Sequence, residues 1–245
     1  MINEELFRRA RSKVIAEDTQ DKGIGTLSEK SMHKIIKLYI DPDEANHEVK
    51  VMGSVADVLN DRGLFEIQTG AISALIPKIG KFINEYHVTV VHPIVAKKKI
   101  RWLDRSTGEL SDGRKSPAKG TLHSSAFELY KSRRFIGEEN FSVKLLFLEC
   151  EEFRSLDGWD STGKKGSSRI ERIPTALLDE IDLHRAGDYR VFLPDELGEN
   201  FFASDFKKAI RSRSRYDYYT LRLLCELGII KKSGKKGNAI IYSRV

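Results

Sequence analysis

The chain has only two cysteines in 245 residues, Cys150 and Cys225, and their spacing is not that of metal ligands. Both are therefore predicted to be reduced thiols rather than parts of a disulfide framework. The six histidines do not recur at zinc-ligand spacing either. The Gly-x-Ser-x-Gly motif that places the nucleophile of one large class of serine hydrolases is also missing.

Long apolar runs are missing as well, so no segment of the sequence is expected to span a bilayer. The opening residues, MINEELFRRARSKV, are charged and helix-like, and they do not resemble a signal peptide. These features predict a cytoplasmic protein without membrane association. Apolar residues make up 40% of the sequence, which is enough for one large domain or two modest ones.

Charge is unevenly distributed along the chain. Residues 201–245 carry eleven Lys and Arg against three Asp and Glu, a net charge of +8. Because the whole chain has a net charge of +6, residues 1–200 must carry −2. A basic segment of this kind is expected where a protein meets phosphate groups.

The most informative segment is residues 54–70, SVADVLNDRGLFEIQTG, which has two apolar runs around a polar turn. The first run contains Asp57, and the second contains Glu66 and Gln68. Carboxylates are costly within an apolar hairpin, so their presence requires a reason. A divalent cation is one such reason, since magnesium binds one or two carboxylates together with substrate phosphate.

Two registers are open for this hairpin. If the turn is centred between residues 61 and 62, Asp57 lies across from Glu66, and Gln68 shares the face of Glu66. If Gly63 instead completes a three-residue loop, the register slips by one residue and Asp57 faces Ile67. The chemistry favours the first register, whereas the turn residues alone do not decide.

The flanking sequence predicts an ordered series of elements. Periodicity and turn signals predict a helix, a strand, the hairpin, a second helix and a buried strand, over residues 26–40, 47–52, 54–70, 71–86 and 88–95. Pro77 is expected either to kink the second helix or to mark its true first turn.

This order of elements, with an acid on the second strand and Glu-x-Gln on the third, resembles the PD-(D/E)XK nuclease superfamily, and most closely its competence CoiA-like branch. The resemblance covers about residues 26–95. It implies that Asp57, Glu66 and the carbonyl of Ile67 bind the metal. Gln68 occupies the place where most relatives have a lysine, and the first-helix acid of the family falls on Glu29.

Simpler interpretations stay open beside these. Asp57 and Glu66 are also compatible with ordinary acids on a solvent-facing strand. Glu29, three residues after Thr26, fits a capping box at the start of a helix. Because the superfamily lysine is missing, a nuclease-like core without activity remains the alternative to an enzyme.

The middle of the chain is less distinctive. We expect a hairpin within residues 97–113, a basic loop over 113–125 and a strand over 142–149. A second basic loop, with Lys164, Lys165, Arg169 and Arg172, is expected to contact nucleic acid or solvent.

The basic C-terminal segment reads as two helices, over residues 202–213 and 216–227, followed by a basic hairpin. This order resembles a winged helix-turn-helix, in which the second helix enters the major groove of DNA. The alternative is a solvated hairpin that docks on the rest of the protein. The expected DNA contacts are Arg211, Arg213, Arg215, Lys231, Lys232, Lys235 and Lys236.

The sequence therefore predicts an α/β (α+β) protein with a restriction-endonuclease-like αβββαβ core, a mixed sheet and a small winged helix domain. The predicted parts are a nuclease-like domain over 1–155, a basic connecting segment over 156–200 and the winged helix over 201–245. The expected function is endonucleolytic hydrolysis of DNA, with Mg²⁺ or Mn²⁺ as cofactor and double-stranded DNA as partner. The alternative is an inactive, nuclease-like DNA-binding regulator. A homodimer stays open.

Overall fold

The computed structural model describes residues 2–21, 30–104, 106–155, 158–159, 165–166, 168–212 and 215–245. The chain forms two compact units, each built from three separate segments. Unit 1 contains residues 1–69, 91–120 and 145–181, and unit 2 contains residues 70–90, 121–144 and 182–245. The predicted C-terminal domain, residues 201–245, is thus part of unit 2 together with earlier segments of the chain.

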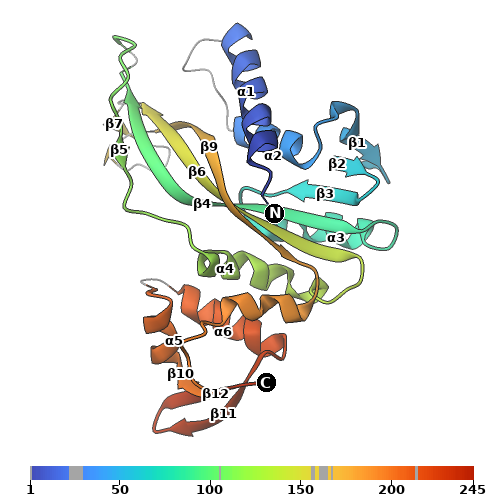
Figure 1. Ribbon diagram of the computed structural model, residues 1–245, viewed down its shortest axis with the longest axis vertical. Coiled ribbons are helices and arrows are strands. Elements are labelled where there is room, and N and C mark those ends of the chain that lie inside the picture. Colours follow the sequence, from blue (N-terminus) through green and yellow to red (C-terminus); the bar gives the residue numbers. More distant parts are fainter. Residues whose placement is uncertain are drawn as a thin grey trace. The chain divides into compact units, whose positions relative to one another are not determined.

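A large mixed sheet dominates the described residues, and its strands follow the order β1-β2-β3-β4-β6-β9, with β5 paired to β4 (Figure 1). Its strands are β1 (His47–Val51), β2 (Ser54–Asn60), β3 (Gly63–Ile67), β4 (Val88–Leu103), β5 (Arg114–Lys115), β6 (Phe141–Ser155) and β9 (Arg169–Leu183). With its helices, this sheet confirms the predicted α+β class. A separate short pair joins β7 (Gly158–Trp159) and β8 (Lys165–Gly166).

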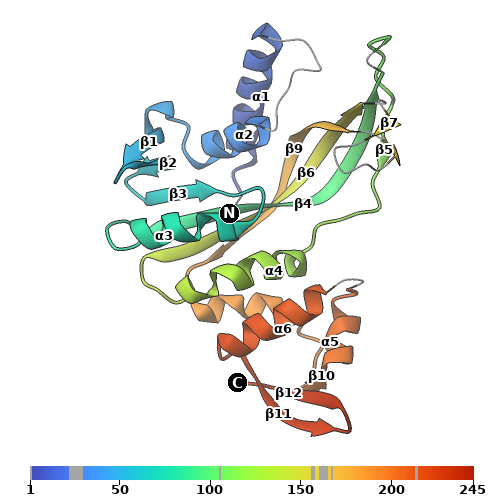
Figure 2. The same ribbon diagram turned by 180° about the vertical axis from the view of Figure 1, so that it is seen from behind.

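Two helices pack against the sheet within unit 1. They are α1 (Glu4–Asp21) and α2 (Lys30–Ile40), which lie beside one another in both ribbon views (Figures 1 and 2). Buried side chains of both helices share one apolar cluster with β2, β3, β4, β6 and β9, including Ile35, Phe65 and Leu146. The predicted N-terminal helix is present as α1, and the helix predicted over 26–40 is present from Lys30 on as α2. Residues 22–29 lie outside the described residues.

Pro77 begins a helix rather than kinking one. Residues Ile72–Leu75 form a 3₁₀ turn, η2, and α3 (Ile76–Phe82) follows with Pro77 in its first turn. This placement suits proline because the first helical N–H groups have no partner within the helix.

Unit 2 contains α4 (Leu122–Ser132), which packs against α6 (Tyr216–Glu226). Its remaining elements are η3 (Arg133–Phe135), η4 (Ala186–Phe192), β10 (Asn200–Phe202), α5 (Ala203–Ala209), β11 (Ile230–Lys236) and β12 (Ala239–Arg244). Phe201 stacks on both Phe206 and Tyr242, which joins β10, α5 and β12 in one aromatic core. The three strands pair in the order β10-β12-β11.

Two predicted loops are partly regular structure. The loop expected over residues 113–125 includes β5 and ends in α4, whose capping residue Thr121 accepts a hydrogen bond from the N–H of Ser124. Arg169 and Arg172, expected in a basic loop, lie in β9. Pro174 did not prevent this strand, because β9 is at the edge of the sheet, where a missing N–H donor is tolerated.

Candidate functional site

The hairpin β2–β3 has the even register. Val58 pairs with Phe65, and both belong to the apolar cluster under α1 and α2. Continued by one residue, this register would place Asp57 across from Glu66. The slipped register, with Asp57 across from Ile67, is therefore excluded.

The carboxylate of Asp57 is held by two contacts. Its Oδ2 accepts a hydrogen bond of 2.7 Å from the backbone N–H of Ile67 and lies 3.2 Å from Nε2 of His33 on α2. The side chains of Asp57 and His33 are 20% and 32% exposed, so both remain accessible from solvent. The helix, β2 and β3 thus meet at one carboxylate.

The two other predicted residues on β3 are more enclosed. Glu66 is 1% exposed, and the Gln68 side chain is half-buried just beyond the strand. The backbone of Gln68 is fixed on both sides: its N–H donates to the carbonyl of Val91, and its own carbonyl lies 2.8 Å from Nδ1 of His92. Because a carbonyl can only accept, His92 must carry a proton on Nδ1.

Glu48 is a third acid at this place that the sequence analysis missed. His47 pairs with Val58 and Val49 pairs with Ala56, so Glu48 lies across from Asp57 on the other side of β2. Its φ of +51° is unusual for a residue that is not glycine. A hydrogen bond from Lys37 lowers the pKa of Glu48, against an opposing effect of burial and of the Asp57 charge.

Beside these residues lies an open pocket of about 740 Å³. Its lining is formed by His33, Lys34, Lys37, Glu44, His47, Glu48 and Thr69. Lys37 is 9% exposed at its side chain and donates a 2.7 Å hydrogen bond to Glu48, whereas Lys34 pairs with Glu17. Acids, lysines and imidazoles therefore line a space large enough for a phosphate group and its neighbours.

The potential ligands near Asp57 carry oxygen atoms, the donor type that a hard cation prefers. Two carboxylates, a backbone carbonyl at Ile67 and the amide of Gln68 supply oxygen atoms, which Mg²⁺ and Mn²⁺ prefer. Among the described residues, no three His, Cys, Asp or Glu side chains are arranged to hold a metal by themselves. A cation at Asp57 and Glu66 would therefore need oxygen ligands from the substrate or from water as well. Glu29, the predicted first-helix acid, lies outside the described residues.

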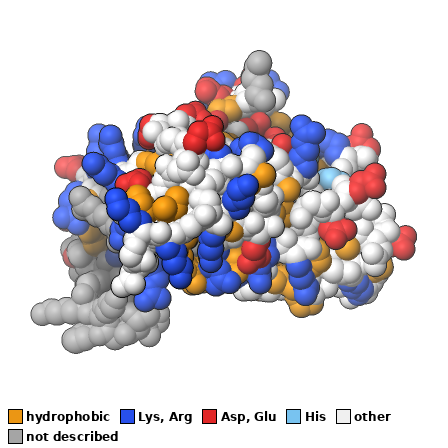
Figure 3. Space-filling view, turned by 90° about the horizontal axis from the view of Figure 1, so that it is seen from below, with side chains coloured by type: hydrophobic (Ala, Val, Ile, Leu, Met, Phe, Trp, Pro, Cys, Tyr) orange, Lys and Arg blue, Asp and Glu red, His pale blue; other side chains and the backbone are white. Residues whose placement is uncertain are grey.

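The predicted DNA contacts in unit 2 lie on the surface. Arg211 and Arg215 are exposed next to α5 and α6, and Arg213 lies outside the described residues. The hairpin β11–β12 carries the exposed cations Lys231, Lys232, Lys235 and Lys236, all on β11. In Figure 3, blue Lys and Arg side chains recur across the face shown, between apolar and acidic ones.

The surface of α6 is mixed in charge. Tyr218 is 51% exposed and receives a 3.0 Å hydrogen bond from Arg222, which also lies over the rings of Tyr218 and Tyr130. Asp217 and Glu226 belong to the same helix. The helix predicted to read DNA thus has both signs of charge, and the cations concentrate on β11.

Comparisons with known proteins match part of this chain to one family of unknown function and to one relative. Residues 30–184 match the family described as "Domain of unknown function (DUF8091)". An "Uncharacterized protein" of Treponema pallidum (strain Nichols) is 26% identical over 228 residues, which cover 90% of this chain and 87% of that protein. No solved structure matches the chain. Because the match spans more than half of the sequence, the chain belongs to the DUF8091 family.

Proposed function

We propose that this protein is a metal-dependent endonuclease that hydrolyses DNA phosphodiester bonds. The observation that carries the proposal is the even register of β2 and β3, which, continued by one residue, would make Asp57 and Glu66 cross-strand neighbours. Asp57 also contacts His33, which lines the polar pocket. Two acids so placed repel each other unless something lies between them. A divalent cation would remove that cost and would give the pair a function.

The order of elements supports the same proposal. Helix α2 is followed by β1, β2, β3, α3 and β4, which is the αβββαβ order expected of a PD-(D/E)XK core. In unit 2, α5, α6 and the β11–β12 hairpin follow the order of a winged helix. In this proposal the winged helix holds duplex DNA and the core cleaves it.

Each residue of the proposed site has a distinct role. Asp57, Glu66 and the carbonyl of Ile67 would hold Mg²⁺ or Mn²⁺. Such a cation lowers the pKa of bound water and offsets charge on a phosphate. Gln68 would orient the attacking water by hydrogen bonding. Lys37, which is nearly buried against Glu48, keeps positive charge at the pocket where a phosphate would enter.

Specific contacts also favour the second candidate function, an inactive nuclease-like protein that binds DNA. Oδ2 of Asp57 already accepts the N–H of Ile67 and lies beside His33. Glu66 is almost fully buried, and Gln68 replaces the lysine of most PD-(D/E)XK relatives. An inactive core would use the same residues to stabilise the hairpin.

Cleavage of supercoiled plasmid in the presence of Mg²⁺ separates these two functions. We expect the purified protein to nick plasmid DNA, and we expect Asp57→Asn and Glu66→Gln each to abolish nicking while the circular dichroism spectrum is unchanged. Glu5→Gln, a neutralisation on exposed α1, is the matched control and should retain full activity. Undiminished nicking by both site variants would exclude this site, and salt-dependent DNA binding without any product would favour the regulator.

A further inference from the structure

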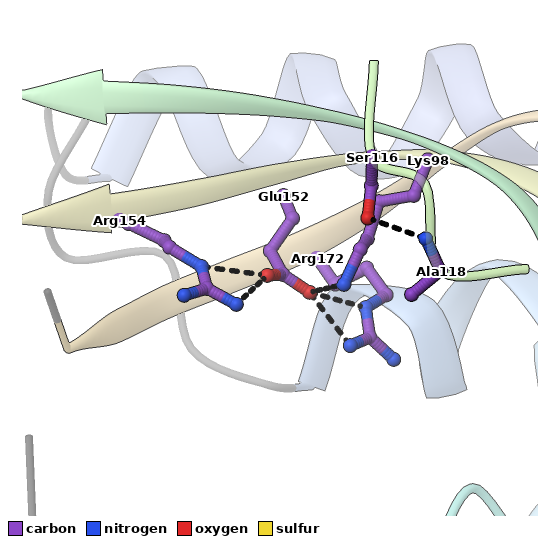
Figure 4. A network of polar contacts seen from close by, with 6 residues as sticks. All are labelled: Lys98, Ser116, Ala118, Glu152, Arg154 and Arg172. Carbon is purple, nitrogen blue, oxygen red and sulfur yellow. Dashed lines mark hydrogen bonds and ion pairs between the residues drawn. The ribbon is translucent and has the colours of Figure 1, made fainter. Parts of the chain in front are cut away.

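A second charged cluster lies in unit 1, at the part of the sheet formed by β4, β6 and β9 (Figure 4). Glu152 is 0% exposed, and both of its carboxylate oxygens accept hydrogen bonds from Lys or Arg side chains. Arg154 contacts Oε1 through Nε at 2.8 Å and Nη2 at 2.6 Å. Arg172 contacts Oε2 through Nε at 3.1 Å and Nη2 at 2.6 Å, and Lys98 Nζ contacts the same oxygen at 2.9 Å.

This cluster has more positive than negative charge. Three cations surround a single carboxylate, which leaves two positive charges in excess. Burial opposes ionisation of Glu152, but hydrogen bonds from Arg172, Lys98 and Arg154 outweigh it and lower the pKa to about 2. Glu152 is therefore ionised at neutral pH, and the excess is not reduced by its protonation.

The cations of the cluster are only partly covered. The side chains of Lys98, Arg154 and Arg172 are 13%, 33% and 26% exposed. Each guanidinium contacts Glu152 through Nε and Nη2, so its Nη1 group does not contact this carboxylate, as Figure 4 shows. Arginines fixed in this way lose little further entropy when they bind a planar or tetrahedral oxyanion.

The neighbouring strands add an independent observation. Lys99 on β4 pairs directly with Lys115 on β5, and Ile100 pairs with Arg114. Because side chains alternate along a strand, Arg114 shares the face of Ile100 and Lys98, whereas Lys99 and Lys115 lie on the opposite face. Arg114 also lies over the ring of Trp102 at 5.7 Å. Cations next to an aromatic ring are typical of surfaces that bind nucleic acids.

We propose that Lys98, Arg154 and Arg172, oriented by Glu152, contact the phosphodiester backbone of DNA, together with Arg114. A linear polyanion fits better than a small phosphate ligand, because the cations follow neighbouring strands rather than enclosing one cavity. The inference rests on the proposed function in one respect, since DNA is the partner of both. It adds a backbone-binding surface to unit 1, apart from the proposed winged helix.

Binding to a fluorescent DNA duplex in EDTA tests this surface without any cleavage. Arg154→Gln leaves Arg172 and Lys98 on Glu152, so the fold should be kept. We expect the Kd to rise about tenfold, and the slope of log Kd against log salt to fall by about 1. Arg114→Gln removes one cation outside the Glu152 cluster, on the same face as Lys98, and should lower the slope by about 1.

Arg9→Gln, which removes one exposed positive charge from α1, is the matched control. If Arg154→Gln and Arg114→Gln change affinity no more than Arg9→Gln does, the proposed surface is wrong. If Arg154→Gln unfolds, Arg114→Gln decides. Displacement of DNA by inorganic phosphate at constant ionic strength would mean that the site takes free phosphate, which also overturns the proposal. If the wild-type protein does not nick plasmid but the variants weaken DNA binding as expected, only the proposed endonuclease is overturned.

Discussion

The backbone N–H of Ile67 on β3 donates a 2.7 Å hydrogen bond to Oδ2 of Asp57 on β2. This contact gives Asp57 a structural role besides any role in binding a metal. A substitution that removes the carboxylate therefore affects stability and chemistry at the same time. The two effects must be separated before activity can be interpreted.

The first prediction makes that separation. Asp57→Ala should lower the free energy of unfolding by about 1–3 kcal/mol, because the N–H of Ile67 loses its acceptor. Asp57→Asn keeps an oxygen that can accept this hydrogen bond and should cost much less. Urea unfolding of both variants measures the difference. Equal loss of stability in the two would show that the Ile67 contact contributes little.

The second prediction concerns the turn of the hairpin. Gly63 has a φ of +117°, which a side chain makes unfavourable. Gly63→Ala should therefore lower the free energy of unfolding by about 1 kcal/mol or more. Gly187→Ala is the matched control, because nothing lies within 4 Å of its added Cβ and its φ is not in the positive region. Thermal unfolding should show a lower Tm for the first variant alone.

The third prediction concerns the buried carboxylate Glu152. Glu152→Gln should lower the free energy of unfolding by about 3–5 kcal/mol at neutral pH, since three cations lose their counter-charge. The carboxyl has a pKa of about 2 in the folded state, below its ordinary value of 4.5. Its contribution is therefore complete above pH 4.5 and is lost as the pH falls towards 2.

Urea unfolding at several pH values tests this dependence. The difference between the wild type and Glu152→Gln should be constant above pH 4.5 and should shrink steadily as the pH approaches 2. A difference that disappears already near neutral pH would contradict the assigned network. Glu151→Gln, whose partner Arg101 is a single cation, serves as the control and should have a smaller effect.

The fourth prediction concerns the thiols. Cys150 is fully buried, and burial raises its pKa to about 12, so it should resist alkylation in the native protein. Burial also raises the pKa of Cys225, but this side chain lines an open pocket beside α6 and should be alkylated first. Mass spectrometry after timed labelling gives the order. Modification of Cys150 before Cys225 would contradict the packing of β6.

The sequence predicted local features well where neighbouring residues determine them. The even register of β2 and β3 was one of two that the turn residues left open, and the chemistry of the acids favoured it. A first helical turn was one of the two positions expected for Pro77. Arg169 and Arg172 were expected in a basic loop, whereas they lie in β9, an edge strand that tolerates the missing N–H of Pro174. The tolerance depends on the position of the strand in the sheet, which one sequence does not reveal.

The site residues show the same limit. Asp57 and Glu66 are close in sequence, so the hairpin that relates them could be predicted. Glu48 belongs beside them only through the register of β1 and β2, which depends on the Met52-Gly53 turn. In the Glu152 cluster, Lys98 and Arg172 lie 54 and 20 positions from Glu152 in the sequence. No short sequence motif therefore indicated this cluster.

Diffraction from crystals soaked in Mn²⁺, recorded at a wavelength where manganese scatters anomalously, tests the central claim most directly. The proposed endonuclease predicts an anomalous peak between the carboxylates of Asp57 and Glu66, within bonding distance of the carbonyl of Ile67. The peak should disappear in Asp57→Asn. A well-ordered hairpin without any peak at these oxygens would contradict a metal-dependent cutting centre.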